Sequence, residues 1–261
     1  MTMLEARNLV KEFGELRATD DISVQFGKEE GEMAFIVGPN GAGKTTLINL
    51  LTGLLEPDEG SVIIHEETEN GTVENDITDM RPDKRVKEGL VRSFQIVHLF
   101  EEMTVRENIR TAALSNHGKF SEVRSLDDEH EVVESDVDDL IEQFRLEDVA
   151  DEVADTLPHG DRKLLDVAIS FALEPNYLLL DEPTSGVGSE EKEYVIETVV
   201  EASKEQNVST VTIEHDMDIV RNYADRMVAL VEGSVFREGS PTLLDTDAEL
   251  RRTLLGVTDD E

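Results

Sequence analysis

One stretch of the sequence combines the residue types that bind phosphate groups. Residues 38–45 read Gly-Pro-Asn-Gly-Ala-Gly-Lys-Thr, a glycine and four residues followed by Gly-Lys-Thr. The glycines let successive backbone N–H groups point inward as a nest for an anion, and the positive end of a following helix adds to it. Lys44 would reach the β- and γ-phosphates of a nucleotide, and the Thr45 hydroxyl would ligate Mg²⁺. We call residues 38–46 the phosphate loop, and its candidate nucleotide contacts are Gly38, Pro39, Asn40, Gly41, Ala42, Gly43, Lys44, Thr45 and Thr46.

The flanks of the phosphate loop favour this interpretation over a simple glycine-rich hairpin. The run 33–37 before it is apolar, as in a buried strand. Residues 44–55 after it carry leucines and an isoleucine at helical spacing. A strand before and a helix after are the context that a phosphate-binding loop requires.

A second stretch supplies two carboxylates. Residues 177–182 read Tyr-Leu-Leu-Leu-Asp-Glu, an apolar strand that ends in Asp181 and Glu182. Asp181 would hold Mg²⁺ through its water shell, and Glu182 would orient and polarise the attacking water. Taken alone, Asp-Glu-Pro after a strand is also a common turn. In one chain with the phosphate loop, the pair predicts hydrolysis of a nucleoside triphosphate.

The elements that must position these residues alternate along the chain. Strand-like runs at 177–180, 210–213 and 227–231 are separated by helical stretches at 190–205 and 217–223. This alternation predicts an α/β fold, with a mainly parallel sheet and helices on both faces.

Between about residues 90 and 172 the pattern changes, and only helices are expected there. The candidate helices are 105–114, 134–144 and 162–173. The stretch 115–139 is polar and acidic, so its first half is expected to be an exposed loop. A helical insertion into the α/β core accounts for this change.

Charge and composition limit the possible partners. The 261 residues include 24 Lys and Arg against 60 Asp and Glu, a formal net charge of −36, and no Cys. Because this charge repels phosphate backbones, we expect no nucleic-acid partner. We interpret the surface as halophilic, since molar salt shortens the screening length to about 3 Å; the alternative is an ordinary acidic mesophilic protein. The sequence has no run of 18 apolar residues and no apolar signal core, so a cytoplasmic placement is expected.

With these residues assembled, the sequence resembles the ATP-binding subunits of ABC transporters over nearly its whole length. The resemblance implies a P-loop NTPase fold with a RecA-like core and mainly parallel sheet, an N-terminal antiparallel β part and an inserted α-helical subdomain. It implies one domain, residues 1–257, with its α/β core at 1–89 and 174–257. The helical subdomain would cover about 90–173, and residues 258–261 would form a frayed tail.

The resemblance also implies roles for three single residues. Gln95 sits where the family has a glutamine that touches Mg²⁺ and the water beside the membrane-subunit contact. His215, in Ile-Glu-His-Asp-Met, looks like the histidine that bonds the γ-phosphate, and Phe13 matches the aromatic residue that stacks on adenine. The implied cofactors are ATP and Mg²⁺, the catalytic residues Glu182, His215 and Gln95, and the metal ligands Thr45, Gln95 and Asp181.

One stretch departs from the family pattern. The family has Leu-Ser-Gly-Gly-Gln to clasp the γ-phosphate of ATP bound to the opposite subunit. This chain has, as its signature segment, Leu157, Pro158, His159, Gly160 and Asp161. Pro158 has neither hydroxyl nor N–H, whereas Gly160 and the start of the following helix remain available. The loop 185–188 also lacks the family's Asp. These departures predict a heterodimer whose other ATP-binding subunit supplies an ordinary signature.

Further similarity is to the ATPases of branched-chain amino acid importers. It covers residues 89–95 and 99–108, the Glu-His-Asp-Met of 214–217 and the Leu-Gly of 255–256. The resemblance implies an ATP-hydrolysing subunit at the cytoplasmic face of the cell membrane. Its partners would be permease subunits and, indirectly, an extracellular solute-binding protein, for import of branched-chain amino acids or a similar small polar solute. A urea or amide importer ATPase, a soluble ABC ATPase without a permease and a regulatory nucleotide-binding module stay open as alternatives.

Overall fold

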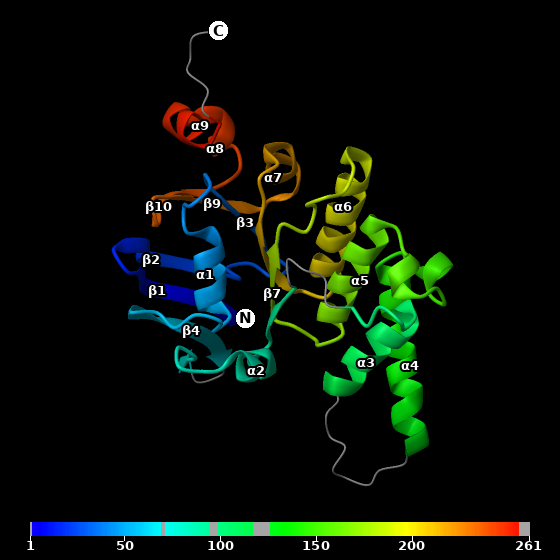
Figure 1. Cartoon of the computed structure of the whole chain (residues 1–261). Coiled ribbons are helices and arrows are strands. Elements are labelled where there is room, and N and C mark those ends of the chain that lie inside the picture. The colour runs from blue at the N-terminus through cyan, green and yellow to red at the C-terminus, as the bar shows by residue number, and fades with distance from the viewer. Residues whose placement is uncertain (1, 69–70, 94–98, 117–125, 256–261) are drawn as a thin grey trace.

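The computed structural model describes residues 2–68, 71–93, 99–116 and 126–255, and its strands form two sheets within these ranges (Figure 1). The first sheet is antiparallel and has the order β2-β1-β4-β5. Its strands are β1 Thr2–Phe13, β2 Leu16–Phe26, β4 Glu59–Thr68 and β5 Gly71–Asp76. Alternate residues of β2 are buried, because successive side chains of a strand point to opposite faces. This sheet confirms the expected N-terminal antiparallel part.

The second sheet carries the segments that flank the candidate site. Its order is β10-β9-β3-β8-β7-β6, and only β10 runs antiparallel to its neighbour. Its strands are β3 Met33–Val37, β6 Leu90–Arg92, β7 Tyr177–Asp181, β8 Ser209–Ile213, β9 Arg226–Val231 and β10 Ser234–Gly239. Every residue of β3, β7 and β8 is buried, as in a parallel sheet covered on both faces. The mainly parallel α/β sheet is thus confirmed.

Helices cover this sheet from both sides. They are α1 Lys44–Leu51, α2 Pro82–Arg85, α3 Val105–Asn116, α4 Leu126–Gln143, α5 His159–Phe171, α6 Ser189–Glu205, α7 Met217–Tyr223, α8 Leu243–Thr246 and α9 Ala248–Leu255. Ala34 and Ile36 of β3 pack in one core with α1 and the antiparallel sheet. Met33 and Phe35 face the other side, where α6, α7, α8 and α9 contribute to a second core. The helix α1 therefore lies between the two sheets.

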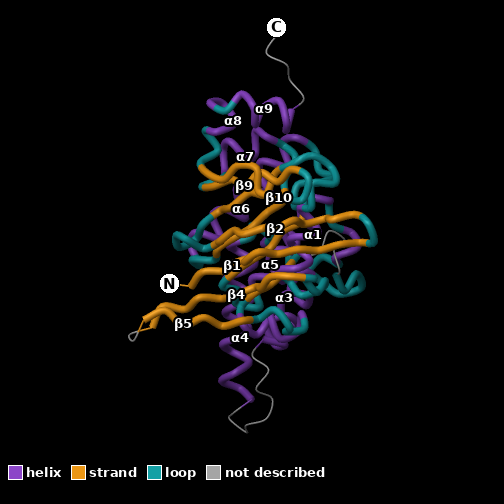
Figure 2. The backbone as a smooth tube through the Cα atoms, turned by 90° about the vertical axis from the view of Figure 1, so that its left-hand side faces the viewer, coloured by secondary structure: helices purple, strands orange, loops and turns teal. Residues whose placement is uncertain are grey.

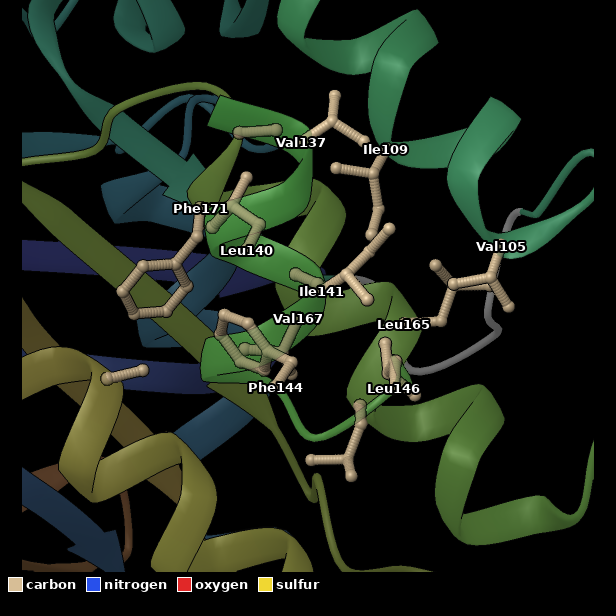
Figure 3. Packing of buried hydrophobic residues seen from close by; sticks show 14 of the residues in the cluster. Val105, Ile109, Val137, Leu140, Ile141, Phe144, Leu146, Leu165, Val167 and Phe171 are labelled. Carbon is tan, nitrogen blue, oxygen red and sulfur yellow. The ribbon is translucent and has the colours of Figure 1, made fainter. Parts of the chain in front are cut away.

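The helices α3, α4 and α5 share a third core (Figure 3). The rings of Phe144 and Phe171 meet edge to face there, with their centroids 5.1 Å apart. Figure 2 places α4 at one end of the molecule and α8 and α9 at the other. No helix among the described residues is long and apolar enough to cross a bilayer.

Two expectations for the middle of the chain were wrong. Residues 90–172 are not helical throughout, because Leu90–Arg92 forms β6 and pairs with β7. Three residues are too few to show a period, and their pairing partner lies far away in the sequence. Helix α4 also begins at Leu126, earlier than the expected residue 134, because its many acidic residues hide its apolar spacing. The subdomain boundaries stay a prediction, and the tail 258–261 lies outside the described residues.

Candidate nucleotide-binding site

The phosphate loop connects β3 to α1 and passes close to two other strands. A Cβ on Gly38 would lie 2.2 Å from the carbonyl oxygen of Leu230 in β9, and one on Gly43 would lie 2.4 Å from that of Ala18 in β2. Both glycines also have positive φ angles, 155° and 97°. Only glycine fits both the space and the backbone conformation at these positions. The loop is thereby held in a fixed path between the two sheets.

Lys44 folds back over the phosphate loop. Its buried ammonium donates hydrogen bonds to the carbonyl oxygens of Gly38 at 2.7 Å and Pro39 at 3.1 Å. Burial lowers the pKa of Lys44, and the negative charges of Glu182 and Asp181 oppose this lowering. The helix α1 begins at Lys44, and its N-cap residue Gly43 provides no side-chain cap, so its first N–H groups are available to an anion.

The two carboxylates lie at the same sheet edge as the phosphate loop. The strands β3, β8 and β7 are parallel neighbours, so their carboxyl ends meet at one edge, where such sheets bind ligands. Asp181, the last residue of β7, is only 5% exposed. Burial raises the pKa of Asp181, while the positive charge of Arg92 opposes this rise.

The next residue, Glu182, contacts the predicted histidine. Its Oε1 lies 2.9 Å from Nε2 of His215, which follows the carboxyl end of the adjacent strand β8. Both side chains remain partly exposed to solvent. The arrangement can present a carboxylate to a water molecule while the imidazole fixes that carboxylate by a hydrogen bond.

Sequence reasoning missed a buried carboxylate beside this pair. Glu214 accepts hydrogen bonds from the Thr184 hydroxyl at 2.6 Å and from the backbone N–H of His215 at 3.1 Å. Burial raises the pKa of Glu214, although these hydrogen bonds oppose the rise. Glu214 thus ties the segment after Glu182 to the segment that carries His215. In the sequence, the only sign of this role was that Glu214 directly follows the strand-like run 210–213.

The other predicted residues lie away from this contact. Phe13 ends β1 with 47% of its surface exposed, and its ring centroid lies 5.9 Å from Nζ of Lys11. Gln95 lies outside the described residues. No hydrogen bond joins the signature segment to the phosphate loop in the part of the chain that the structure describes.

The signature segment lies at the start of α5. Pro158 is the residue before the helix and provides no side-chain cap. Leu157 and Gly160 are buried, whereas His159 is exposed. A Cβ on Gly186, in the loop 185–188, would lie 3.0 Å from Nε2 of His159. The two segments that depart from the family pattern therefore lie close together.

Comparison with known proteins decides the family. The family model described as "ABC transporter" matches residues 21–185. The chain belongs to the ABC transporter family. It is accordingly an ATPase that binds ATP.

Individual ABC ATPases resemble the chain over nearly its full length. The probable branched-chain amino acid transport ATP-binding protein LivG of Archaeoglobus fulgidus is 34% identical over 100% of this chain and 98% of that protein. The high-affinity branched-chain amino acid transport ATP-binding protein LivG of Salmonella typhimurium is 31% identical, with coverage of 97% and 98%.

Solved ABC ATPase structures have the same fold. A nucleotide-free ATP-binding cassette from an ABC transporter superposes with a TM-score of 0.78 at 30% identity, covering 99% of this chain and 100% of that chain. The ADP conformation of an ATP-binding cassette superposes with a TM-score of 0.79 at 29% identity, covering 98% and 100%. The expected P-loop NTPase fold is thereby confirmed.

Proposed function

We propose that this ABC ATPase powers an importer for branched-chain amino acids or a similar small polar solute. The observation that carries the catalytic part is the 2.9 Å contact between Glu182 and His215, at the sheet edge where Lys44 closes the phosphate loop. The substrate part is supported by the relatives whose names specify branched-chain amino acid transport.

The described residues offer groups for the main roles in ATP hydrolysis. The backbone N–H groups of the phosphate loop, together with Lys44, would hold the β- and γ-phosphates. Glu182 would accept the proton of the attacking water, and His215 would hydrogen-bond the γ-phosphate. Phe13 offers an exposed ring on which adenine would stack.

The donor atoms also fit Mg²⁺. Thr45 and Asp181 offer oxygen ligands, and Gln95 would be a third outside the described residues. The described residues include no group of three or more His, Asp or Glu that could hold a metal alone, so phosphate oxygens and water would complete the shell, as is usual for Mg²⁺. When bound, the ion would neutralise charge on the phosphate oxygens.

The signature segment supports a heterodimer. Pro158 stands where the family has a serine and offers neither a hydroxyl nor a backbone N–H, and α5 starts after it without a side-chain cap. A partner with an ordinary signature would complete the phosphate loop of this chain. The composite site that uses this chain's signature segment would be the weaker of the two.

An exposed apolar patch supports docking to a permease at the cytoplasmic face of the membrane. Phe100, Met103 and Val153 are exposed, and the backbone pairs Thr104 with Val153, so the patch lies at one place beside α3. Large apolar side chains that gather at a protein surface commonly mark an interface. An extracellular solute-binding protein would deliver the solute to the other side of the permease.

A transport assay tests the proposal. The chain would be produced together with the second ATPase and the permeases encoded beside it, and membrane vesicles would be tested for ATP-dependent uptake of labelled leucine and of labelled urea. Leucine uptake that is lost in Glu182→Gln, but kept in the exposed control Glu193→Gln on α6, is the expected result. Uptake of urea alone overturns the substrate class, and vesicles that hydrolyse no ATP overturn the whole proposal.

A further inference from the structure

An arginine whose side chain is largely shielded from solvent, and which the proposed mechanism does not use, contacts Asp181. Nη2 of Arg92, at the end of β6, donates a hydrogen bond to Oδ2 of Asp181 at 2.9 Å. The Arg92 side chain is 10% exposed and that of Asp181 is 2% exposed. Nη1 of Arg92 donates to Oδ1 of Asn49 on α1. One guanidinium therefore spans α1 and β7, the elements that follow and face the phosphate loop.

The backbone around Arg92 is fixed on both sides. The strand β6 pairs Arg92 with Leu179 of β7, and the N–H of the next residue, Ser93, donates to the carbonyl oxygen of Leu179 at 3.0 Å. The Ser93 hydroxyl donates to Asp166 on α5, so the segment is also anchored to the helix that follows the signature segment. Arg92 is thus held at Asp181 by its neighbours as well as by its own charge.

The pairing satisfies a carboxylate that would otherwise be costly to bury. An unpaired buried carboxylate is unfavourable, and removal of its partner is strongly destabilising. Yet Nε of Arg92 is buried without a hydrogen-bond partner in the described part of the chain, so the guanidinium is not fully satisfied at this position. Arg92 therefore forms a strong ion pair with Asp181, while its Nε–H has no hydrogen-bond acceptor in the described part of the chain.

We propose that Arg92 is a positioning residue for the metal site: with Asn49 it holds the Asp181 carboxylate and neutralises it, so that a divalent cation competes with Arg92 for Asp181. This inference rests on the proposed role of Asp181 beside Mg²⁺. A divalent cation that approaches Asp181 meets the positive charge of Arg92 and must share or displace it. Nucleotide without a divalent cation meets no such competition, because the hydrogen bonds of Arg92 run to Asn49 and Asp181 and not to the phosphate loop.

Equilibrium binding of a fluorescent ADP, with its fluorophore on the ribose, separates these effects. Its dissociation constant would be measured in EDTA and in saturating Mg²⁺. The constant in EDTA divided by the constant in Mg²⁺ is called the ratio, and a larger ratio means that Mg²⁺ strengthens binding more. In Arg92→Gln the ratio is expected to rise about tenfold, because one unit charge near the ion is removed. The constant in EDTA is expected to change less than the ratio, because the hydrogen bonds of Arg92 run to Asn49 and Asp181 and not to the phosphate loop.

Three further variants make the experiment decisive. Arg92→Lys keeps the charge but cannot bridge Asp181 and Asn49, so its ratio is expected between those of the wild type and Arg92→Gln. Asp181→Asn is expected to lower the ratio by at least tenfold, because it removes the competed ligand. Adding Arg92→Gln to Asp181→Asn should then raise the ratio less than Arg92→Gln does alone, because the two residues are coupled. Thermal unfolding of each variant checks that it is folded.

The outcomes distinguish this inference from the proposed function. A wild-type ratio in both Arg92 variants, with a lowered ratio in Asp181→Asn, overturns the role of Arg92 and leaves the proposed function standing. An unchanged ratio in Asp181→Asn overturns both, because Asp181 would then not face the ion. If Arg92→Gln does not fold, Arg92→Lys decides alone, and a ratio at or below the wild type overturns the inference.

Discussion

Single residues at the sheet edge take their roles from the groups they contact, some close in sequence and some distant. Glu182 and His215 meet because each follows the carboxyl end of one of two adjacent parallel strands, β7 and β8. Lys44 stays buried because the carbonyl oxygens of its own loop accept its hydrogen bonds. The carboxylate of Glu214 accepts a hydrogen bond from the backbone N–H of His215. The residue types were readable in the sequence, but the contact of Glu182 with His215 required the sheet.

Glu182→Gln tests the assignment of the water-activating base. We expect the rate of ATP hydrolysis to fall by about 10²–10⁴-fold, because a positioned general base contributes that much. ATP affinity should change little, since the phosphate loop is intact, and ATP should trap the assembly in its closed dimeric form. Phosphate release and size-exclusion chromatography with ATP measure the two effects. Rapid turnover in the variant, with Glu193→Gln as the matched control, would assign the base elsewhere.

Elements of the two sheets are joined by a buried ion pair. Glu32, just before β3, accepts hydrogen bonds from Nε of Arg226 at 2.6 Å and from the N–H of Gly27 at 2.7 Å. Arg226, which begins β9, also donates to the carbonyl oxygen of Gln25 in β2 at 2.7 Å. Burial alone would raise the pKa of Glu32, but Arg226 and the backbone N–H groups outweigh it, so this pKa lies below its ordinary value of 4.5. The pair therefore fixes the antiparallel sheet against the parallel one.

Glu32→Gln is expected to lower the free energy of unfolding by about 3 kcal/mol at neutral pH, because it leaves Arg226 without its buried partner. A carboxylate with a lowered pKa in the folded state stabilises the fold above its unfolded pKa, and this contribution is lost as pH falls below about 4.5. The difference between the wild type and the variant should therefore shrink from pH 6 to pH 3. Denaturant unfolding in molar KCl at several pH values measures it.

A difference that stays constant over this pH range would contradict the role of the Glu32 charge. Glu193→Gln, an exposed carboxylate on α6, serves as the control and should change the free energy of unfolding by less than about 0.5 kcal/mol at every pH.

The whole molecule carries a formal net charge of −36. Charge of one sign on a compact surface destabilises the folded state through self-repulsion, and this repulsion acts over the screening length of the solution. Ion pairs such as Arg145 with Glu201 and Arg237 with Asp247 cannot offset this charge, because 60 Asp and Glu stand against 24 Lys and Arg. Adaptation to concentrated salt stays a prediction for this chain.

The midpoint of thermal unfolding is expected to rise between low and molar KCl. The screening length falls from about 30 Å at 0.01 M salt to about 3 Å at 1 M, so most of the repulsion is removed. Circular dichroism across a KCl series at constant pH measures the midpoint. A midpoint that stays level or falls would remove the halophilic interpretation.

Short sequence patterns were enough to predict the phosphate-binding residues, the two carboxylates and most of the α/β elements of this protein. The glycines and Lys44 of the phosphate loop, the apolar run before Asp181 and the spacing of the helix α6 are all features of a few consecutive residues. Such short-range patterns reflect backbone conformation and burial, which act within one turn or one strand. The α/β fold, the phosphate loop and the two carboxylates were therefore readable from the sequence.

Only the tertiary structure shows the features that arise when segments distant in the sequence pair with each other. The strand β6 has only three residues and is defined by β7, with which it pairs. The contacts of Arg92 with Asp181 and of Glu214 with Thr184 join residues that no local period connects. A charged residue in a strand-like run is normally a solvated one, and it becomes a buried partner only when the sheet closes around it. The order of the strands sets these contacts, and no short window of sequence contains that order.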